Sequence, residues 1–165
     1  MIIMNDKMRN KIDKHKDYPS SDFINLCEKI VSNLILINDF LIYDYGNKIR
    51  NKKSNINWDR HIEKTNFLSA IEVSFNEIRV YDNVDVFAKE SIIRFLDELH
   101  SQISIKFPDK KVGIIISPFT VINEDDEVIE EDDGFLLRIH TYREDEGYYI
   151  DNIEGFDSPV LYSVN

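Results

Sequence analysis

The sequence predicts an α+β fold, with N-terminal and central helices packed on a mainly antiparallel C-terminal sheet. Apolar residues recur at the three-and-four spacing of a helix over about residues 21–45 and again after residue 85. After Pro108 the pattern changes to short apolar runs and alternation, which are typical of strands. The 165 residues, with five Gly and four Pro, fit a single domain. We expect that domain over residues 20–165, after a polar lead-in over residues 1–19 that could be disordered.

The first helix is expected over about residues 21–45. Ser20 or Ser21 can cap its start, and Gly46 can end it, because glycine readily adopts the conformation that closes a helix. Cys27 lies on the apolar face, so it is expected to be a small core residue and not a nucleophile. That face comprises Phe23, Leu26, Cys27, Ile30, Val31, Leu34, Ile37 and Leu41.

Residues 54–81 fit two interpretations. Phe67, Ile71 and Phe75 have helical spacing, whereas strand-favouring residues crowd the later part of the segment. We expect a helix near residues 57–66, followed by short strands at about 71–75 and 78–80. A central helix is then predicted from a cap at Asp85 to Phe107, since the residue before a proline is pushed out of helical geometry.

Four strands are expected in the C-terminal part. They are residues 112–116, with an option to continue over 119–122, and residues 135–142, 148–153 and 160–164. If these strands form a meander, the loops 123–134 and 154–159 lie at one end of the sheet. The hairpin loop 143–147, which ends in Gly147, lies at the other end.

The net charge of −11 is unevenly distributed. Residues 1–64 carry 12 Lys and Arg against 9 Asp and Glu, whereas residues 65–165 carry 8 against 22. The C-terminal part should therefore repel nucleic acid, and basic proteins are the natural partners. Cys27 is the only cysteine, which argues against a disulfide framework and a cysteine-based zinc site. No apolar stretch resembles a signal peptide or a membrane span, so a cytoplasmic location is the default expectation.

The most informative local feature is an acidic run in the predicted loop 123–134. It could be a solvated loop that keeps the protein soluble, or an interface for a basic partner. A calcium loop is disfavoured, because the acids are contiguous and the only glycine, Gly134, comes at the end. The run comprises Glu124, Asp125, Asp126, Glu127, Glu130, Glu131, Asp132 and Asp133.

Other residues are expected to join this surface. In a meander, Glu154 and Asp157 would lie at the same pole as the acidic run. Tyr142, Tyr148 and Tyr149 cluster in the same acidic quarter, and tyrosine is a frequent interface residue, although half-buried sheet positions explain them equally well.

An alternative site lies on the strand 135–142. Arg138, His140 and Tyr142 would share one face of that strand and could serve an enzyme or a ligand-binding domain. Solvent-facing cross-strand pairs are the plainer interpretation of the same row. The four histidines are isolated, so no metal-binding pair is predicted, and the sequence lacks phosphate-loop, Gly-x-Ser-x-Gly and His-Glu-x-x-His motifs.

In its small size, single domain, strong acidity and lack of a catalytic motif, the chain resembles the bacterial immunity proteins that neutralise toxins of interbacterial competition. The resemblance implies a cytoplasmic inhibitor without enzymatic activity or cofactor. Its partner would be a cationic toxin, as for the many immunity proteins that bind nucleases. The contacting surface would be the acidic run, with Glu154 and Asp157 beside it. A regulatory adaptor of a mobile element would have the same general character.

Overall fold

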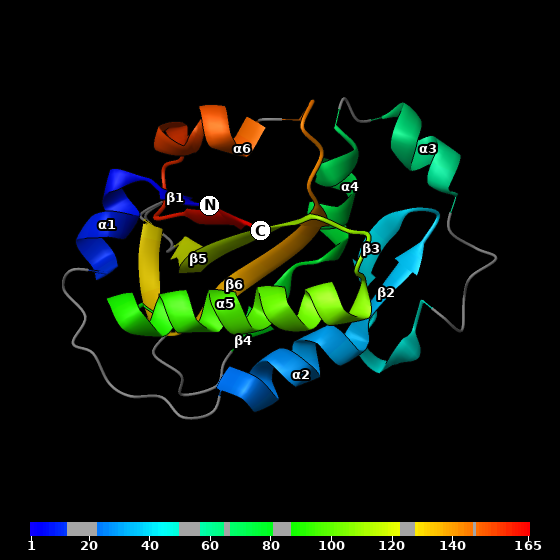
Figure 1. Cartoon of the computed structure of the whole chain (residues 1–165). Helices are drawn as coiled ribbons and strands as arrows, with labels where there is room; N and C mark the ends of the chain where they lie inside the picture. The colour runs from blue at the N-terminus through cyan, green and yellow to red at the C-terminus, as the bar shows by residue number, and fades with distance from the viewer. Residues whose placement is uncertain (13–22, 50–56, 65–66, 81–86, 123–127, 147) are drawn as a thin grey trace.

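The computed structural model describes residues 1–12, 23–49, 57–64, 67–80, 87–122, 128–146 and 148–165. They form the predicted α+β fold, in which helices cover both faces of a five-stranded antiparallel sheet of order β1-β7-β5-β6-β4 (Figure 1). The strands are β1 (Ile2–Met4), β4 (Ile78–Val80), β5 (Val112–Ile122), β6 (Val128–Thr141) and β7 (Leu161–Val164).

One face of the sheet is covered by α2 (Phe23–Asn33) and α5 (Lys89–Lys106), which enclose the main core (Figure 1). Phe95, Leu99 and Ile103 of α5 are wholly buried, and burial of each such side chain contributes about 1.5–3 kcal/mol. The predicted end of α5 at Phe107 is confirmed, whereas its first residue is Lys89, with Ala88 and not Asp85 at the cap position. Cys27 lies in this core, as predicted.

The opposite face is covered by α4 (Leu68–Phe75), α6 (Tyr148–Asp151) and the 3₁₀ turn η3 (Ile153–Gly155). The predicted strand 148–153 and the meander are therefore wrong. Because β6 and β7 both run antiparallel to β5, they run parallel to each other, and a crossover must join them. Ile150 and Ile153 of this crossover pack on the sheet beside Ile115 and Tyr162.

The first predicted helix is too long. It ends at Asn33, and the rest of its apolar pattern forms a hairpin of β2 (Leu34–Ile37) and β3 (Phe40–Tyr43). Asn38 and Asp39 have φ angles of 47° and 71°, as in the two-residue turn that suits a twisted hairpin. Gly46 lies beyond the hairpin in the 3₁₀ turn η1 (Tyr45–Asn47).

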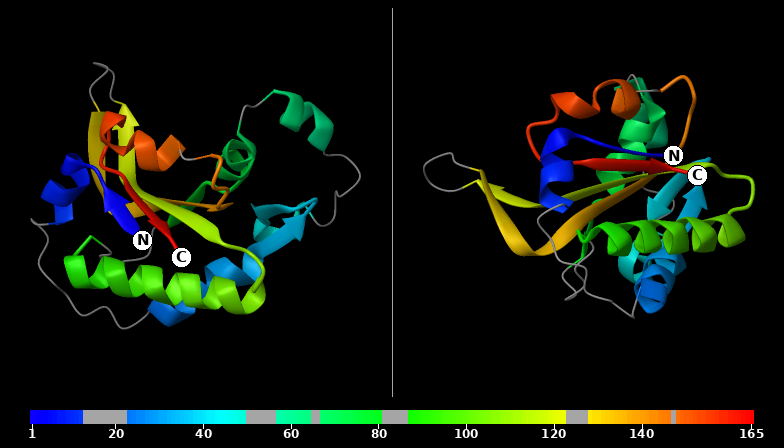
Figure 2. Two further views of the ribbon diagram at one scale, coloured as in Figure 1. Left: turned by 45° about the horizontal axis from the view of Figure 1, so that its top comes forward. Right: turned by 60° about the vertical axis from the view of Figure 1, so that its left-hand side comes forward.

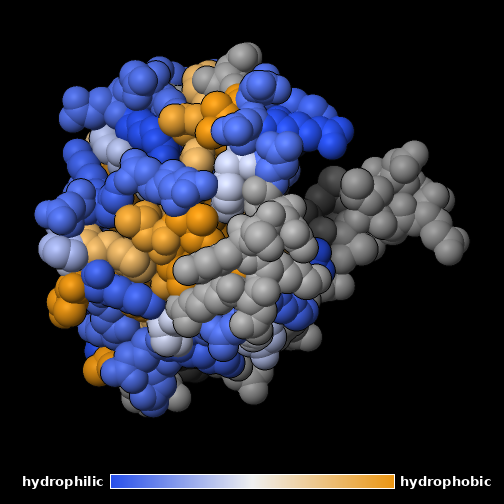
Figure 3. Space-filling view, turned by 90° about the vertical axis from the view of Figure 1, so that its right-hand side faces the viewer, coloured by the Kyte–Doolittle hydropathy of each residue, from blue (hydrophilic) through white to orange (hydrophobic). Residues whose placement is uncertain are grey.

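The hairpin, α3 (Trp58–Glu63) and α4 enclose a second, smaller core. Its centre is a stack of Phe40 on Trp58, with ring centroids 5.4 Å apart. The predicted helix near 57–66 corresponds to α3 and the strand at 78–80 is confirmed, but residues 71–75 belong to a helix, α4. On the side of the molecule shown in Figure 3, apolar side chains reach the surface. In the hairpin and α3, Leu36 and Ile62 are exposed.

The N-terminal residues belong to the fold. Residues 2–12, predicted as part of a polar lead-in, form β1 and α1 (Asp6–Ile12), and Met8 and Ile12 are buried in the main core. The buried Asn5 holds this segment in the fold. Its Oδ1 accepts hydrogen bonds from the N–H groups of Met8 in α1 and of Val160 before β7, at 2.9 and 3.1 Å. Residues 13–19 of the predicted lead-in lie outside the described residues.

Candidate functional site: the acidic β5–β6 arm

β5 and β6 continue beyond the rest of the sheet as a two-stranded arm, residues 119–122 and 128–131. β7 pairs with residues 113–116 of β5, and β4 pairs with residues 135–137 of β6. Among the described residues, residues 119–122 and 128–131 pair only with each other. The two strands therefore project from the body as an arm (Figure 2).

A large bulge separates the arm from the sheet. Pro118 stands opposite Phe135, but Phe119 stands opposite Glu131, so Asp132, Asp133 and Gly134 have no partner on β5. Such bulges bend and twist a strand, and proline is tolerated where the ladder is interrupted. The bulge therefore redirects the two strands as they leave the sheet.

Gly134 is required at the base of the arm. Its φ is +145°, and a Cβ at this position would lie 2.2 Å from the carbonyl oxygen of Val80 and 2.7 Å from Cε2 of Phe119. Neither contact is tolerable, so the chain can pass between β4 and Phe119 only with a glycine here.

The described part of the acidic run is on this arm and its base, not in a long loop. The expected loop 123–134 is wrong for residues 128–134, because Glu130 and Glu131 are paired in β6 opposite Thr120 and Phe119. Asp132 and Asp133 lie in the bulge. Residues 119–134 contain eight acids and no Lys or Arg. Glu124, Asp125, Asp126 and Glu127 lie outside the described residues.

The three predicted interface tyrosines are not on the arm. Tyr142 follows the opposite end of β6, eleven residues from Glu131, which corresponds to roughly 35 Å of extended chain. It is half-buried, and the ammonium of Lys111 lies 4.5 Å from its ring centroid. Tyr148 and Tyr149 begin α6. Their placement separates the tyrosine cluster from the acidic run.

Glu154 and Asp157 contact α1. The carboxylate of Glu154 accepts hydrogen bonds from the Asp6 N–H at 3.1 Å and from the Arg9 guanidinium at 3.3 Å. The carbonyl oxygen of Asp157 accepts one from the Lys7 ammonium at 2.5 Å. These contacts hold the crossover on the N-terminal helix, so the charge of Glu154 is partly neutralised there.

Glu146, in the predicted loop 143–147, has a structural role. Its carboxylate accepts hydrogen bonds from the first N–H groups of α4, those of Leu68 and Ser69, at 2.7 and 2.8 Å. Burial acts to raise the pKa of Glu146, but the hydrogen bonds from Ser69 and Leu68 and the charge of Arg143 outweigh it and lower the pKa.

The alternative site does not form an open face. His140 is 3% exposed, its ring stacks on Tyr162 with centroids 5.7 Å apart, and burial lowers its pKa to about 4. Arg138 turns to Glu77, with 3.4 Å between Nη2 and Oε2. His140 fills the space above Gly113, where a Cβ would lie 2.3 Å from Nε2. A neutral, enclosed imidazole cannot reach a substrate on this face.

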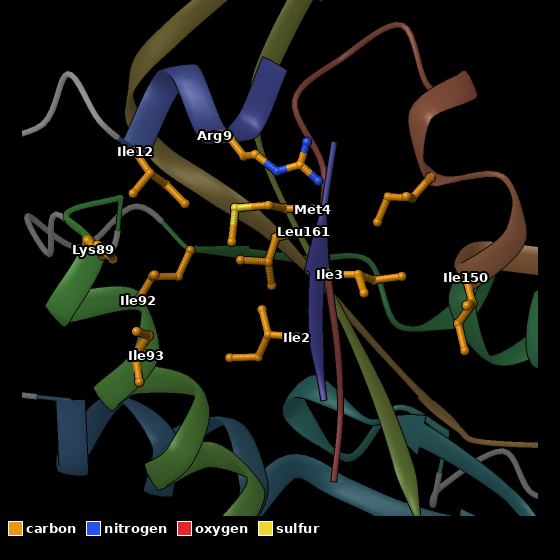
Figure 4. Close-up of a pocket in the computed structure, with 11 residues that line it drawn as sticks. Ile2, Ile3, Met4, Arg9, Ile12, Lys89, Ile92, Ile93, Ile150 and Leu161 are labelled. Atoms are coloured by element: carbon orange, nitrogen blue, oxygen red, sulfur yellow. The ribbon is translucent and has the colours of Figure 1, made fainter. Parts of the chain in front are cut away.

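A pocket that the sequence pattern did not predict lies around β1. It has a volume of about 580 Å³ and is lined mainly by aliphatic side chains, together with Arg9 from α1 and Lys89 from the start of α5 (Figure 4). Its walls come from β1, α1, the start of α5 and the crossover, which are far apart in the chain. The only local signal is the run Ile2, Ile3 and Met4.

The described residues contain no group of three or more His, Cys, Asp or Glu side chains placed to hold a metal ion. None of their helices combines the length and the apolar character needed to cross a membrane.

Residues 3–165 match the model of a family described as the uncharacterized protein PM0498 family. No curated protein and no solved structure is significantly similar to the chain.

Proposed function

The chain belongs to the uncharacterized protein PM0498 family, and we propose that it is a binding protein that recognises a basic protein partner through the acidic arm. The observation that carries the proposal is the position of the acidic run. Four described acids, Glu130, Glu131, Asp132 and Asp133, lie at the base of an arm that pairs with no other described strand or on the arm itself, and the sequence of residues 119–134 contains no Lys or Arg.

The placement of these charges favours recognition over solubility alone. Like charges close together on a ribbon repel one another, and a cationic surface relieves that repulsion. Complementary charge also speeds association, because long-range attraction steers the encounter. An arm that projects from the body can approach a concave partner surface before the rest of the protein makes contact.

Within this class we propose an inhibitor of the immunity type, which acts in the cytoplasm on a cationic toxin. Each strand of the arm has four paired residues beyond the bulge, about 13 Å in length. A ribbon of that size with clustered carboxylates suits a cleft that binds phosphates, such as that of a nuclease. Its occupation by the arm would exclude the nucleic acid.

Charge reversal tests the proposal. The arm variant replaces Glu130, Glu131, Asp132 and Asp133 by Lys. The control replaces four acids elsewhere by Lys, so that both variants change the net charge equally. The control acids are exposed: Glu28, Asp109, Glu144 and Asp145.

Affinity capture from the native host, followed by mass spectrometry and binding kinetics, is the measurement. We expect the wild type and the control to retain a basic protein that the arm variant loses, with an association rate that falls as salt increases. We also expect the captured protein to lose its activity when bound. Retention of the same partner by the arm variant, or an acidic partner, would contradict the proposal.

A further inference from the structure

β1 is an edge strand of the main sheet among the strands that the structure describes. It pairs on one side with β7, and Met1 and Val164 exchange backbone hydrogen bonds at 2.6 and 2.9 Å. In an antiparallel pair the bonded residues alternate, so residues 1, 3 and 5 face β7. The N–H and C=O groups of Ile2 and Met4 therefore point away from the sheet. They make no hydrogen bond to any described residue.

The pocket extends along both faces of this edge. On one face, Ile2 and Met4 lie opposite Ile92 and Ile93 of α5; on the other, Ile3 lies toward Ile150 (Figure 4). Ile2 and Ile93 are 38% and 41% exposed. Successive side chains of a strand point to opposite faces, so a strand added beside β1 would place apolar side chains against both walls. A compact ligand would use one wall only.

The charged residues that line the pocket indicate which charge its occupant should carry. Among the described residues that line it, Arg9 and Lys89 are the charged ones, and both are basic. Arg9 is already paired with Asp6 and Glu154, whereas Lys89 is exposed and makes no ion pair with a described residue. An acidic residue in the occupant would therefore complement Lys89.

The other edge strand of the sheet, β4, is protected against strand addition by charged side chains. β4 carries the exposed Arg79, whose guanidinium lies 3.2 Å from Glu77, and charged side chains discourage strand addition at an edge. β1 has the sequence Ile-Ile-Met and no such charge. The two edges thus differ in the feature that governs pairing with another chain.

We infer that the β1 edge is a docking site for an extended peptide segment of another protein. The segment pairs with the outward N–H and C=O groups of Ile2 and Met4, places alternate aliphatic side chains on the two walls and carries an acidic residue opposite Lys89. This mode of recognition derives affinity from backbone hydrogen bonds and specificity from the alternate side chains. The site is separate from the acidic arm.

The probe is a phage-displayed library of random dodecapeptides. It is selected on the full chain and counter-selected on Ile93→Glu, which introduces a charge into one wall. We expect enriched peptides with alternating aliphatic residues and an Asp or Glu. Ile93→Glu and Lys89→Glu should each weaken a selected peptide at least about tenfold. Ile105→Glu, on the same helix but 80% exposed and outside the pocket, should leave affinity within about twofold.

Backbone recognition is tested separately. Selected peptides methylated at the backbone nitrogens that face β1 should lose binding, and the unmodified peptides should slow amide hydrogen exchange at Ile2 and Met4. The arm variant should bind these peptides as the wild type does. The inference is overturned if no peptide is enriched, or if binding survives both Ile93→Glu and N-methylation.

Hydrogen exchange of the free chain distinguishes other occupants. We expect the Ile2 and Met4 amides to exchange rapidly at all protein concentrations. Protection at every concentration would mean that the chain covers its own edge. Protection that grows with dimerisation, measured by sedimentation, would mean that a second copy does so. Either result would overturn the inference.

Discussion

The carboxylate of Glu72 lies 2.7 Å from the guanidinium Nη1 of Arg143, and the glutamate side chain is wholly inaccessible to solvent. The same carboxylate accepts hydrogen bonds from the backbone N–H of Leu41 in the hairpin and of Thr141 in the main sheet, at 2.6 and 2.9 Å. One buried side chain of α4 thus joins the two sheets.

Glu72→Ala should lower the free energy of unfolding by about 3–5 kcal/mol, because it removes the carboxylate partner of Arg143 and leaves two backbone N–H groups without an acceptor. Glu72→Gln keeps one acceptor oxygen, so it should lower the free energy of unfolding by less than Glu72→Ala does. The control is Glu77→Ala, which removes exposed ion pairs with Arg79 and Arg138 and should lose less than about 1 kcal/mol. Urea denaturation measures the free energy of unfolding of the three variants. Equal decreases for Glu72→Ala and Glu77→Ala would refute the role assigned to Glu72.

Acid should destabilise the protein through its buried histidine. Burial lowers the pKa of His140 from 6.5 to about 4 in the folded chain, so the unfolded chain takes up a proton first as the pH falls. The stabilisation is present above pH 6.5 and is lost between pH 6.5 and 4, up to about 3 kcal/mol.

His140→Phe should keep the ring stacked on Tyr162 and remove this contribution. Denaturation at pH 7 and pH 4.5 should then show a smaller acid-induced loss in the variant than in the wild type. Carboxylates titrate in both proteins, so the difference between them reports the histidine. Equal losses would show that His140 does not titrate in this way.

Gly134→Ala should destabilise the fold by about 1–3 kcal/mol, because the new Cβ meets the Val80 carbonyl and the φ of +145° suits glycine alone. Gly155→Ala is the matched control, since nothing lies within 4 Å of a Cβ there, and it should change stability by less than about 0.5 kcal/mol. The shift of the denaturation midpoint measures the change in stability of both variants. A stable Gly134→Ala protein would show that the base of the arm adjusts freely.

The thiol of Cys27 should be unreactive in the folded protein. Its side chain is wholly buried, and burial, with the charge of Glu98, raises its pKa to about 12. Ellman's reagent at pH 8 should label no thiol in native buffer and one per chain in denaturant. Rapid labelling in native buffer would indicate that α2 opens away from the sheet.

Several elements could be predicted because their signals are local. The apolar face and the Pro108 stop specify α5, and the run of β-branched residues at 112–116 specifies the start of β5. The hairpin after Asn33 was missed because its apolar residues continue the helical spacing of α2. The turn residues Asn38 and Asp39 were the available signal.

By itself, the sequence determined the α+β class, the acidic run and its lack of basic neighbours. Tertiary structure alone decided where the acids lie: Glu130 and Glu131 on a two-stranded arm, Glu154 against α1 and Glu146 at the start of α4. It also decided that β1 is an edge and that His140 is enclosed. Strand order and burial depend on pairings between residues far apart in the chain, such as Ile3 with Tyr162, and no local pattern encodes them.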